Sequence, residues 1–159
     1  DDLRTRLNDL VAGVHALYFN ITPTEFANLA LVAIPDGLLR SVENLFTIGT
    51  TKVGDTSALF MIFKIKAGAY DRALARMFDW EETMAMDLSV IWPISPELTT
   101  GPVAKTNFTD KRVSNLDTRI LYQTTGQPVL VYTFFNNAII LITTTDQAIP
   151  DLIGRITPS

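Results

Sequence analysis

The stretch Pro128–Thr144, PVLVYTFFNNAIILITT, decides the fold of this 159-residue chain. Two apolar runs rich in β-branched and aromatic residues, Pro128–Phe135 and Ala138–Thr144, flank the pair Asn136-Asn137. Asparagine tolerates a positive φ better than most residues, so this pair between two such runs predicts a two-residue type I′ turn. The stretch therefore predicts a β-hairpin with a positive φ at both asparagines.

Two further strands are predicted just ahead of this hairpin. They cover Phe108–Ser114 and Asp117–Gln123, with one short turn at Asn115-Leu116 and another at Thr125–Gln127. Strands that follow one another across short turns pair antiparallel with their neighbours. Residues 108–144 therefore predict a four-stranded antiparallel meander.

A second hairpin and a long helix precede the meander. Phe46–Thr51 and Ala58–Lys66 have the pattern of two strands, and Gly54-Asp55 between them is a hairpin signal. Apolar residues at helical spacing then predict a long helix over Ala69–Val90, which two following prolines end.

The rest of the chain is assigned from periodicity and from proline. Apolar positions at intervals of three and four predict an N-terminal amphipathic helix over Leu3–Tyr18, which ends before Pro23. We expect a strand at Phe26–Ile34 and a short helix over Leu38–Leu45. The remaining predicted segments are a crossover loop over Trp92–Lys105 and a short final helix over Gln147–Ile156.

These elements predict a single α+β domain over residues 1–159, in which an antiparallel sheet is packed by an N-terminal, a long central and a short C-terminal helix. Ala58–Phe63 and Val129–Phe135 are apolar at consecutive positions, so we expect both sheet faces to be covered there. The order of hairpin and then helix occurs at 46–90 and again at 129–156. This weak ββα repeat fits a gene duplication and a chance recurrence equally well. The predicted core includes Leu59, Met61, Phe63, Leu74, Phe78, Leu88, Val131, Ile140 and Ile142.

The composition excludes several classes of protein. Hydrophobic residues make up 47% of the chain and charged residues 19%, which is typical of a globular domain and not of a disordered one. The net charge of -4 and the lack of a Lys/Arg cluster argue against binding to nucleic acids or anionic membranes. The longest apolar runs are much shorter than a membrane span, and nothing at Asp1 resembles a signal peptide.

The sequence offers little for catalysis or metal binding. The absence of cysteine excludes disulfides, thiolate metal sites and a cysteine nucleophile. The single histidine, His15, lies beside the apolar stripe of the predicted first helix, a position typical of a structural or solvated residue. Neither a Gly-rich phosphate loop nor an H-E-x-x-H or G-x-S-x-G motif occurs, and we expect no metal and no cofactor.

Glu81 is the most informative polar residue. At 100° per residue, it falls in the middle of the apolar arc of the predicted helix over Ala69–Val90. A carboxylate there needs a hydrogen-bond or ionic partner, and Arg119 on a meander strand is the leading candidate, with Arg112 as the substitute. Two roles stay open: a structural anchor, and a ligand-binding or proton-transfer carboxylate. A carboxylate pair for sugar hydrolysis, drawn from Asp79, Glu81, Asp110 and Asp117, is a further alternative.

Three stretches together resemble an uncharacterised family of membrane-anchored extracytoplasmic bacterial proteins from small uncultivated lineages. They are Phe78–Met84 (FDWEETM) with Asp87-Leu88; Phe108–Asp110 with Ser114-Asn115, Asp117 and Arg119; and Tyr132, Phe134 and Ile142–Thr144. The resemblance implies a place outside the membrane and no assigned activity. It points to Trp80, Glu81, Asp117 and Arg119 as motif positions, either in a ligand site or as structural anchors.

We expect a non-enzymatic interaction or assembly module of the cell envelope, with a protein partner or self-association. The alternative is a small-ligand-binding sensor domain with a pocket near Glu81, and an acid-base hydrolase ranks third. An enclosed cavity beside Glu81 would favour the sensor, a broad exposed apolar patch the interaction module, and two carboxylates facing across a cleft the hydrolase.

Overall fold

The computed structural model describes residues 16–18, 22–99 and 107–156. Within these ranges, seven strands and several short and medium helices follow one another along the chain. The strands are β1 (Ala16–Tyr18), β2 (Val42–Val53), β3 (Thr56–Ile65), β4 (Phe108–Val113), β5 (Leu116–Tyr122), β6 (Pro128–Phe135) and β7 (Ile139–Thr143). The helices are α2 (Pro23–Ala30), α3 (Asp36–Leu39), α4 (Tyr70–Trp80), α5 (Met84–Leu88) and α6 (Ile149–Ile156), with 3-10 turns at Pro96–Leu98 and Asp146–Ala148.

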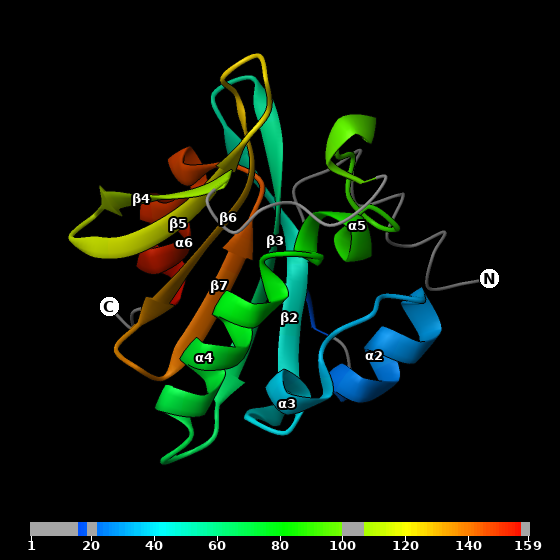
Figure 1. The fold of residues 1–159 in the computed structure, drawn as a ribbon. Helices are drawn as coiled ribbons and strands as arrows, with labels where there is room; N and C mark the ends of the chain where they lie inside the picture. Colours follow the sequence, from blue (N-terminus) through cyan, green and yellow to red (C-terminus); the bar gives the residue numbers. More distant parts are fainter. Residues whose placement is uncertain (1–15, 19–21, 100–106, 157–159) are drawn as a thin grey trace.

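The strands form one antiparallel sheet in the order β1-β2-β3-β7-β6-β5-β4 (Figure 1). The predicted meander is present as β4 to β7, and the predicted upstream hairpin as β2 and β3. The hairpin joins the meander through β3, which pairs with β7 over Phe60–Lys64 and Ile139–Thr143. The predicted α+β fold class is therefore confirmed.

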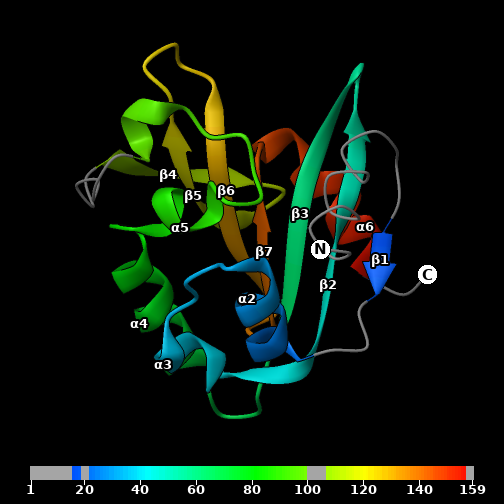
Figure 2. The ribbon, with the colours of Figure 1, turned by 90° about the vertical axis from the view of Figure 1, so that its right-hand side faces the viewer.

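Helices cover both faces of the sheet (Figures 1 and 2). The larger core lies between one face and α2 to α5, and its strand residues alternate with those that face α6 on the other side. Along β3, for example, Met61 packs into the larger core and Phe60 into the smaller one. Of the predicted core residues, seven are buried, Leu74 is half-buried and Phe78 is 41% exposed.

Both asparagines of the predicted hairpin turn have a positive φ, 53° at Asn136 and 55° at Asn137. Phe135 pairs with Ile139, so the loop also includes Ala138, whose N–H donates to the carbonyl oxygen of Phe135. The β4–β5 turn has the same backbone form, with a positive φ at Ser114 and Asn115. Val113 pairs directly with Leu116 there, which makes the turn two residues long.

The strand expected at Phe26–Ile34 is wrong, because the helix α2 occupies Pro23–Ala30. Thr22 is its N-cap, and the Thr22 hydroxyl oxygen accepts the N–H of Glu25 at 3.1 Å. Pro23 stands at the first helical position, where the missing N–H costs nothing and the fixed φ suits a helix. The proline interpreted as the end of one helix is thus the start of another.

Two other boundaries differ from the expectation. The expected N-terminal helix falls largely outside the described residues, as does His15, but its last three residues form β1, which pairs with β2. The short helix expected over Leu38–Leu45 is α3, which ends at Leu39, and β2 starts at Val42. Part of the loop expected over Trp92–Lys105 also lies outside the described residues.

The long helix expected over Ala69–Val90 is broken after Trp80. At the break, the N–H of Glu81 donates to Phe78 and that of Thr83 to Trp80, the tightened spacing of a helix end. The buried stripe of α4 is Ala73, Met77, Trp80 and Glu81. Phe78 is about 100° from Met77 around the helix, at the border of this stripe, which explains its exposure.

The two ββα units place their helices on opposite faces of the sheet. β2-β3 is followed by α4 on the larger core and β6-β7 by α6 on the smaller core. A rotation about an axis perpendicular to the sheet superimposes the β2-β3 hairpin on the β6-β7 hairpin and leaves the two faces of the sheet unchanged. The same rotation therefore does not superimpose α4 on α6, because these helices lie on opposite faces.

Candidate functional site

The candidate site starts from one row of side chains across the meander. Asp110 of β4 pairs with Arg119 of β5, and Arg119 pairs with Tyr132 of β6. Directly paired residues of neighbouring strands point to the same side of the sheet. All three therefore lie on the face that α4 covers.

Glu81, the first residue after α4, lies directly above this row. Its carboxylate accepts two hydrogen bonds from Arg119, from Nε to Oε2 at 2.8 Å and from Nη2 to Oε1 at 2.7 Å. The Tyr132 hydroxyl donates to Oε2 at 2.5 Å. The side chain of Glu81 is 1% exposed and that of Arg119 20% exposed. The predicted contact between Glu81 and Arg119 is thus present. It is bidentate, which makes it stronger than a single hydrogen bond between such a pair.

The network extends outward from Glu81 to the sheet edge. Nη1 of Arg119 donates to Oδ1 of Asp110 at 3.0 Å, and the Asp110 side chain is 88% exposed. The ring of Phe78 covers the guanidinium of Arg119 at 5.7 Å. One arginine therefore joins a buried carboxylate to an exposed one and is shielded by an aromatic ring.

The surroundings fix the protonation of the two donors. Burial, and then the hydrogen bond to Glu81, raise the pKa of Tyr132 well above the ordinary tyrosine value. The hydrogen bond to Glu81 likewise raises the pKa of Arg119. Tyr132 therefore remains a neutral hydrogen-bond donor, and Arg119 remains a cation, throughout the physiological pH range.

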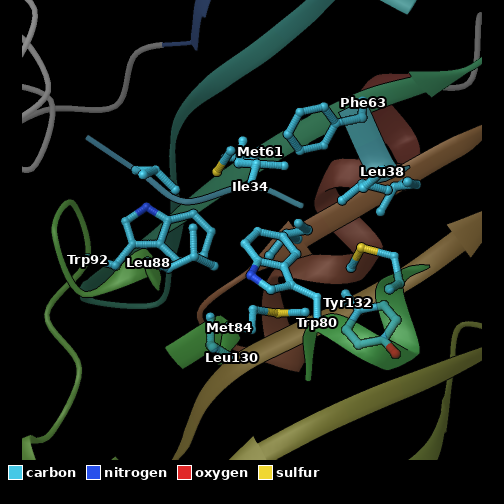
Figure 3. Packing of buried hydrophobic residues seen from close by; sticks show 14 of the residues in the cluster. Ile34, Leu38, Met61, Phe63, Trp80, Met84, Leu88, Trp92, Leu130 and Tyr132 are labelled. Carbon is cyan, nitrogen blue, oxygen red and sulfur yellow. The ribbon is translucent and has the colours of Figure 1, made fainter. Parts of the chain in front are cut away.

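Trp80 fixes the end of α4 from the opposite side. Its indole lies in the middle of the larger core, whereas the hydroxyl of Tyr132 points away from the labelled aliphatic side chains (Figure 3). Nε1 of Trp80 donates to Oδ2 of Asp87 in α5 at 2.8 Å, across the break between the helices. This bond and the core contacts hold the segment that carries Glu81.

An open groove of about 800 Å³ lies above this network. One wall is α4, with Tyr70, Leu74 and Phe78 at intervals of four residues. The other walls and the floor come from β4, β5, β6 and their turns. The lining residues there are Asp110–Arg112, Asn115–Arg119, Tyr132–Phe134, Asn136 and Asn137.

The structure brings two of the four predicted site residues, Glu81 and Arg119, into direct contact. Arg119 also lines the groove, whereas the Trp80 side chain lies in the larger core and bonds to Asp87. Asp117 lies on the groove wall, 94% exposed, and accepts a hydrogen bond from Arg112 at 2.8 Å. Its partner is thus a neighbouring surface arginine and not the buried network.

Tyr132 is the site residue that sequence reasoning missed. Counting outward from the predicted turn between β5 and β6 does not place it, because the register shifts between Leu121 and Tyr122, and this shift sets Tyr132 opposite Arg119. Asp110 was considered only as half of a hydrolytic pair. Asp110 and Glu81 both accept hydrogen bonds from the Arg119 guanidinium, so the two carboxylates bind one cation and do not face each other across a cleft.

The arrangement is suited to holding a groove in shape. Three donors occupy the Glu81 oxygens, and the exposed wall carboxylates Asp110 and Asp117 are each bonded to an arginine. Among residues 16–18, 22–99 and 107–156, no cluster of three acidic or histidine side chains could hold a metal ion. In the same part of the chain, no helix is long and apolar enough to cross a membrane.

The fold and the site define an α+β domain whose seven-stranded antiparallel sheet carries a groove over a buried Glu-Arg-Tyr network. No protein-family model, no curated protein and no solved structure matches this chain.

Proposed function

We propose that this chain is a non-enzymatic interaction module that receives an extended segment of a partner protein in the groove between α4 and the β4–β5 hairpin. The observation that carries this proposal is Phe78. This residue is 41% exposed on the groove wall, while the opposite side of α4 is buried in the core. An aromatic ring held at the surface over an arginine is a common anchor of protein interfaces.

The shape of the groove supports a chain segment as its occupant. Small-molecule sites are mostly enclosed and bury most of the ligand. This groove is partly open to solvent and combines an apolar wall with a polar one, an arrangement that suits a segment with apolar side chains on one face. The Glu81 network would keep the two walls at a fixed separation.

A sensor function is the second candidate, and Arg119 favours it. This arginine lines the groove and keeps two N–H groups beyond the three used by Glu81 and Asp110. A small carboxylate could displace the exposed Asp110 and bind Arg119 in its place. The resemblance to membrane-anchored extracytoplasmic proteins fits either function and supports a place in the bacterial cell envelope.

The proposal is tested by selecting peptides from a random display library on the wild-type protein. We expect selected peptides to perturb the amide NMR signals of α4, β4 and β5. Phe78→Glu should weaken their binding at least tenfold, because it puts a charge where the apolar anchor lies. Leu29→Glu is the matched control, since Leu29 is 53% exposed on α2, outside the groove.

Three outcomes are informative. Peptides that bind Phe78→Glu as tightly as the wild type contradict the groove as the binding surface. A selection that yields no groove-binding peptide argues against the interaction module. Shifts confined to Arg119 and its neighbours on titration with small carboxylates, abolished in Arg119→Gln, support the sensor instead.

A further inference from the structure

Among the described residues, no strand pairs with the outer edge of β4. β4 ends the sheet, and among the described residues β5 is its one strand neighbour (Figure 1). Val113 and Leu116 close a two-residue turn, so they exchange backbone hydrogen bonds with each other. Bonding alternates along an antiparallel pair, which leaves the N–H and C=O groups of Asp110 and Arg112 directed away from β5. Such groups are a template for another strand.

The side chains along this edge carry charges in a definite order. Asp110 and Arg112 lie on the α4 face, because they pair with Arg119 and Asp117 of β5. Each of these two cross-strand pairs is hydrogen-bonded and unites opposite charges. Lys111 lies between them on the α6 face.

We propose that β4 pairs antiparallel with β4 of a second copy of this chain, with Lys111 opposite its own counterpart on a two-fold axis. In this register, Asp110 of each copy lies directly opposite Arg112 of the other. Their outward N–H and C=O groups form four backbone hydrogen bonds across the interface. The two sheets become one continuous sheet.

Charge selects this register over its neighbours. A two-fold axis at Asp110 would place two aspartates opposite each other, and one at Arg112 would place two arginines there. With the axis at Lys111, the row across the interface reads Arg119, Asp110, and then Arg112 and Asp117 of the second copy. The signs alternate along the whole row.

The two lysines at the axis are already neutralised within their own chains. Nζ of Lys111 lies 2.7 Å from Oδ2 of Asp146, whose side chain is 15% exposed. Charged residues on an edge strand often prevent pairing with other chains. Here the order of the charges is complementary to itself and favours pairing.

The first experiment exchanges charges and measures self-association by sedimentation equilibrium. In a homodimer of Asp110→Lys or of Arg112→Glu, both contacts between residue 110 of one copy and residue 112 of the other bring together two like charges. We therefore expect each variant to raise the dimer Kd at least tenfold. When the two variants are mixed, both contacts of the heterodimer again unite opposite charges, one with the signs exchanged and the other as in the wild type. A heterodimer should therefore form close to the wild-type affinity. Circular dichroism checks that each variant is folded.

The second experiment uses the absence of cysteine from the chain. In the proposed register the Cα atoms of the two Lys111 residues are about 4.5 Å apart, as in a non-hydrogen-bonded pair. Lys111→Cys should therefore oxidise to a covalent dimer. Thr109→Cys is the matched control on the same strand and face, because the two copies of residue 109 would lie about 13 Å apart.

Several results would overturn the proposal. One is a wild-type protein that stays monomeric up to about 1 mM, the weak end of measurable association. Another is a dimer that neither charge variant weakens, or a mixture that associates no better than its components. Equal cross-linking of the two cysteine variants would reject the register centred on Lys111.

Discussion

Glu81 is the central residue of the hydrogen-bonded network at the site. A carboxylate that is 1% exposed in an apolar core is tolerated because Arg119 and Tyr132 supply three donors. Its burial was predictable from the helical phase, and its main partner from that phase together with the motif resemblance, which favoured Arg119 over Arg112. Tyr132 was not predicted, because that step needs the exact register of two strands.

Glu81→Gln should lower the free energy of unfolding by about 1.5–3 kcal/mol, because Arg119 loses a charged bidentate acceptor. Urea unfolding measures the change. Glu97→Gln is the control at an exposed glutamate, and we expect it to change stability little. If Glu81→Gln is as stable as the wild type but no longer binds a groove ligand, Glu81 acts in binding and not as an anchor.

Tyr132 should make the protein less stable at high pH. The folded protein holds the Tyr132 proton more strongly than the unfolded chain does, since its pKa is raised in the fold. Above the ordinary tyrosine pKa of about 10, the unfolded chain loses this proton first, so the free energy of unfolding falls as the pH rises. Below that pH, the contribution of Tyr132 to the free energy of unfolding does not change with pH.

The decrease in the free energy of unfolding that Tyr132 causes reaches about 1.4 kcal/mol per pH unit. Tyr132→Phe lacks it, so its stability should decline less steeply than that of the wild type between about pH 10 and 11.5. The raised pKa of Lys111 acts in the same direction but is common to both proteins. Parallel curves for the two proteins would show that Tyr132 keeps no raised pKa in the fold.

At the scale of elements, two differences from the sequence prediction have identifiable causes. One is the helix start around Pro23, and the other is the helix break after Trp80. Residues 26–34 are apolar enough for a strand, but Thr22, Pro23 and Glu25 together form a helix start. The break after Trp80 has no glycine or proline to mark it. It depends on tertiary contacts, with Trp80 bonded to α5 and Glu81 bonded to the sheet.

Removal of the α2 cap is a direct test at this scale. Thr22→Ala leaves the N–H of Glu25 without its acceptor and should cost about 0.5–2 kcal/mol in stability. Thr24→Ala, at an exposed position in the first turn of the same helix, is the matched control and should be neutral or slightly stabilising. Equal effects of the two substitutions in thermal unfolding would contradict the capping role of Thr22.

At the scale of the whole molecule, local turns predicted both hairpins and the meander, because each pairing joins neighbours in the sequence. The pairing of β3 with β7 was not predicted. It joins strands about 80 residues apart, and no turn connects them. From the sequence, β3 and β7 can be recognised only as apolar strands that each need a neighbouring strand on both sides.

The place of β7 has a consequence for how the chain is made. Of the described strands, β7 is the last to be synthesised, and it lies between the β2-β3 hairpin and the rest of the meander, so these two parts of the sheet cannot be joined before it emerges. Until residues 139–143 emerge, β3 presents its apolar edge over Phe60–Lys64 to other nascent chains. During synthesis, we expect this edge to need protection by a chaperone.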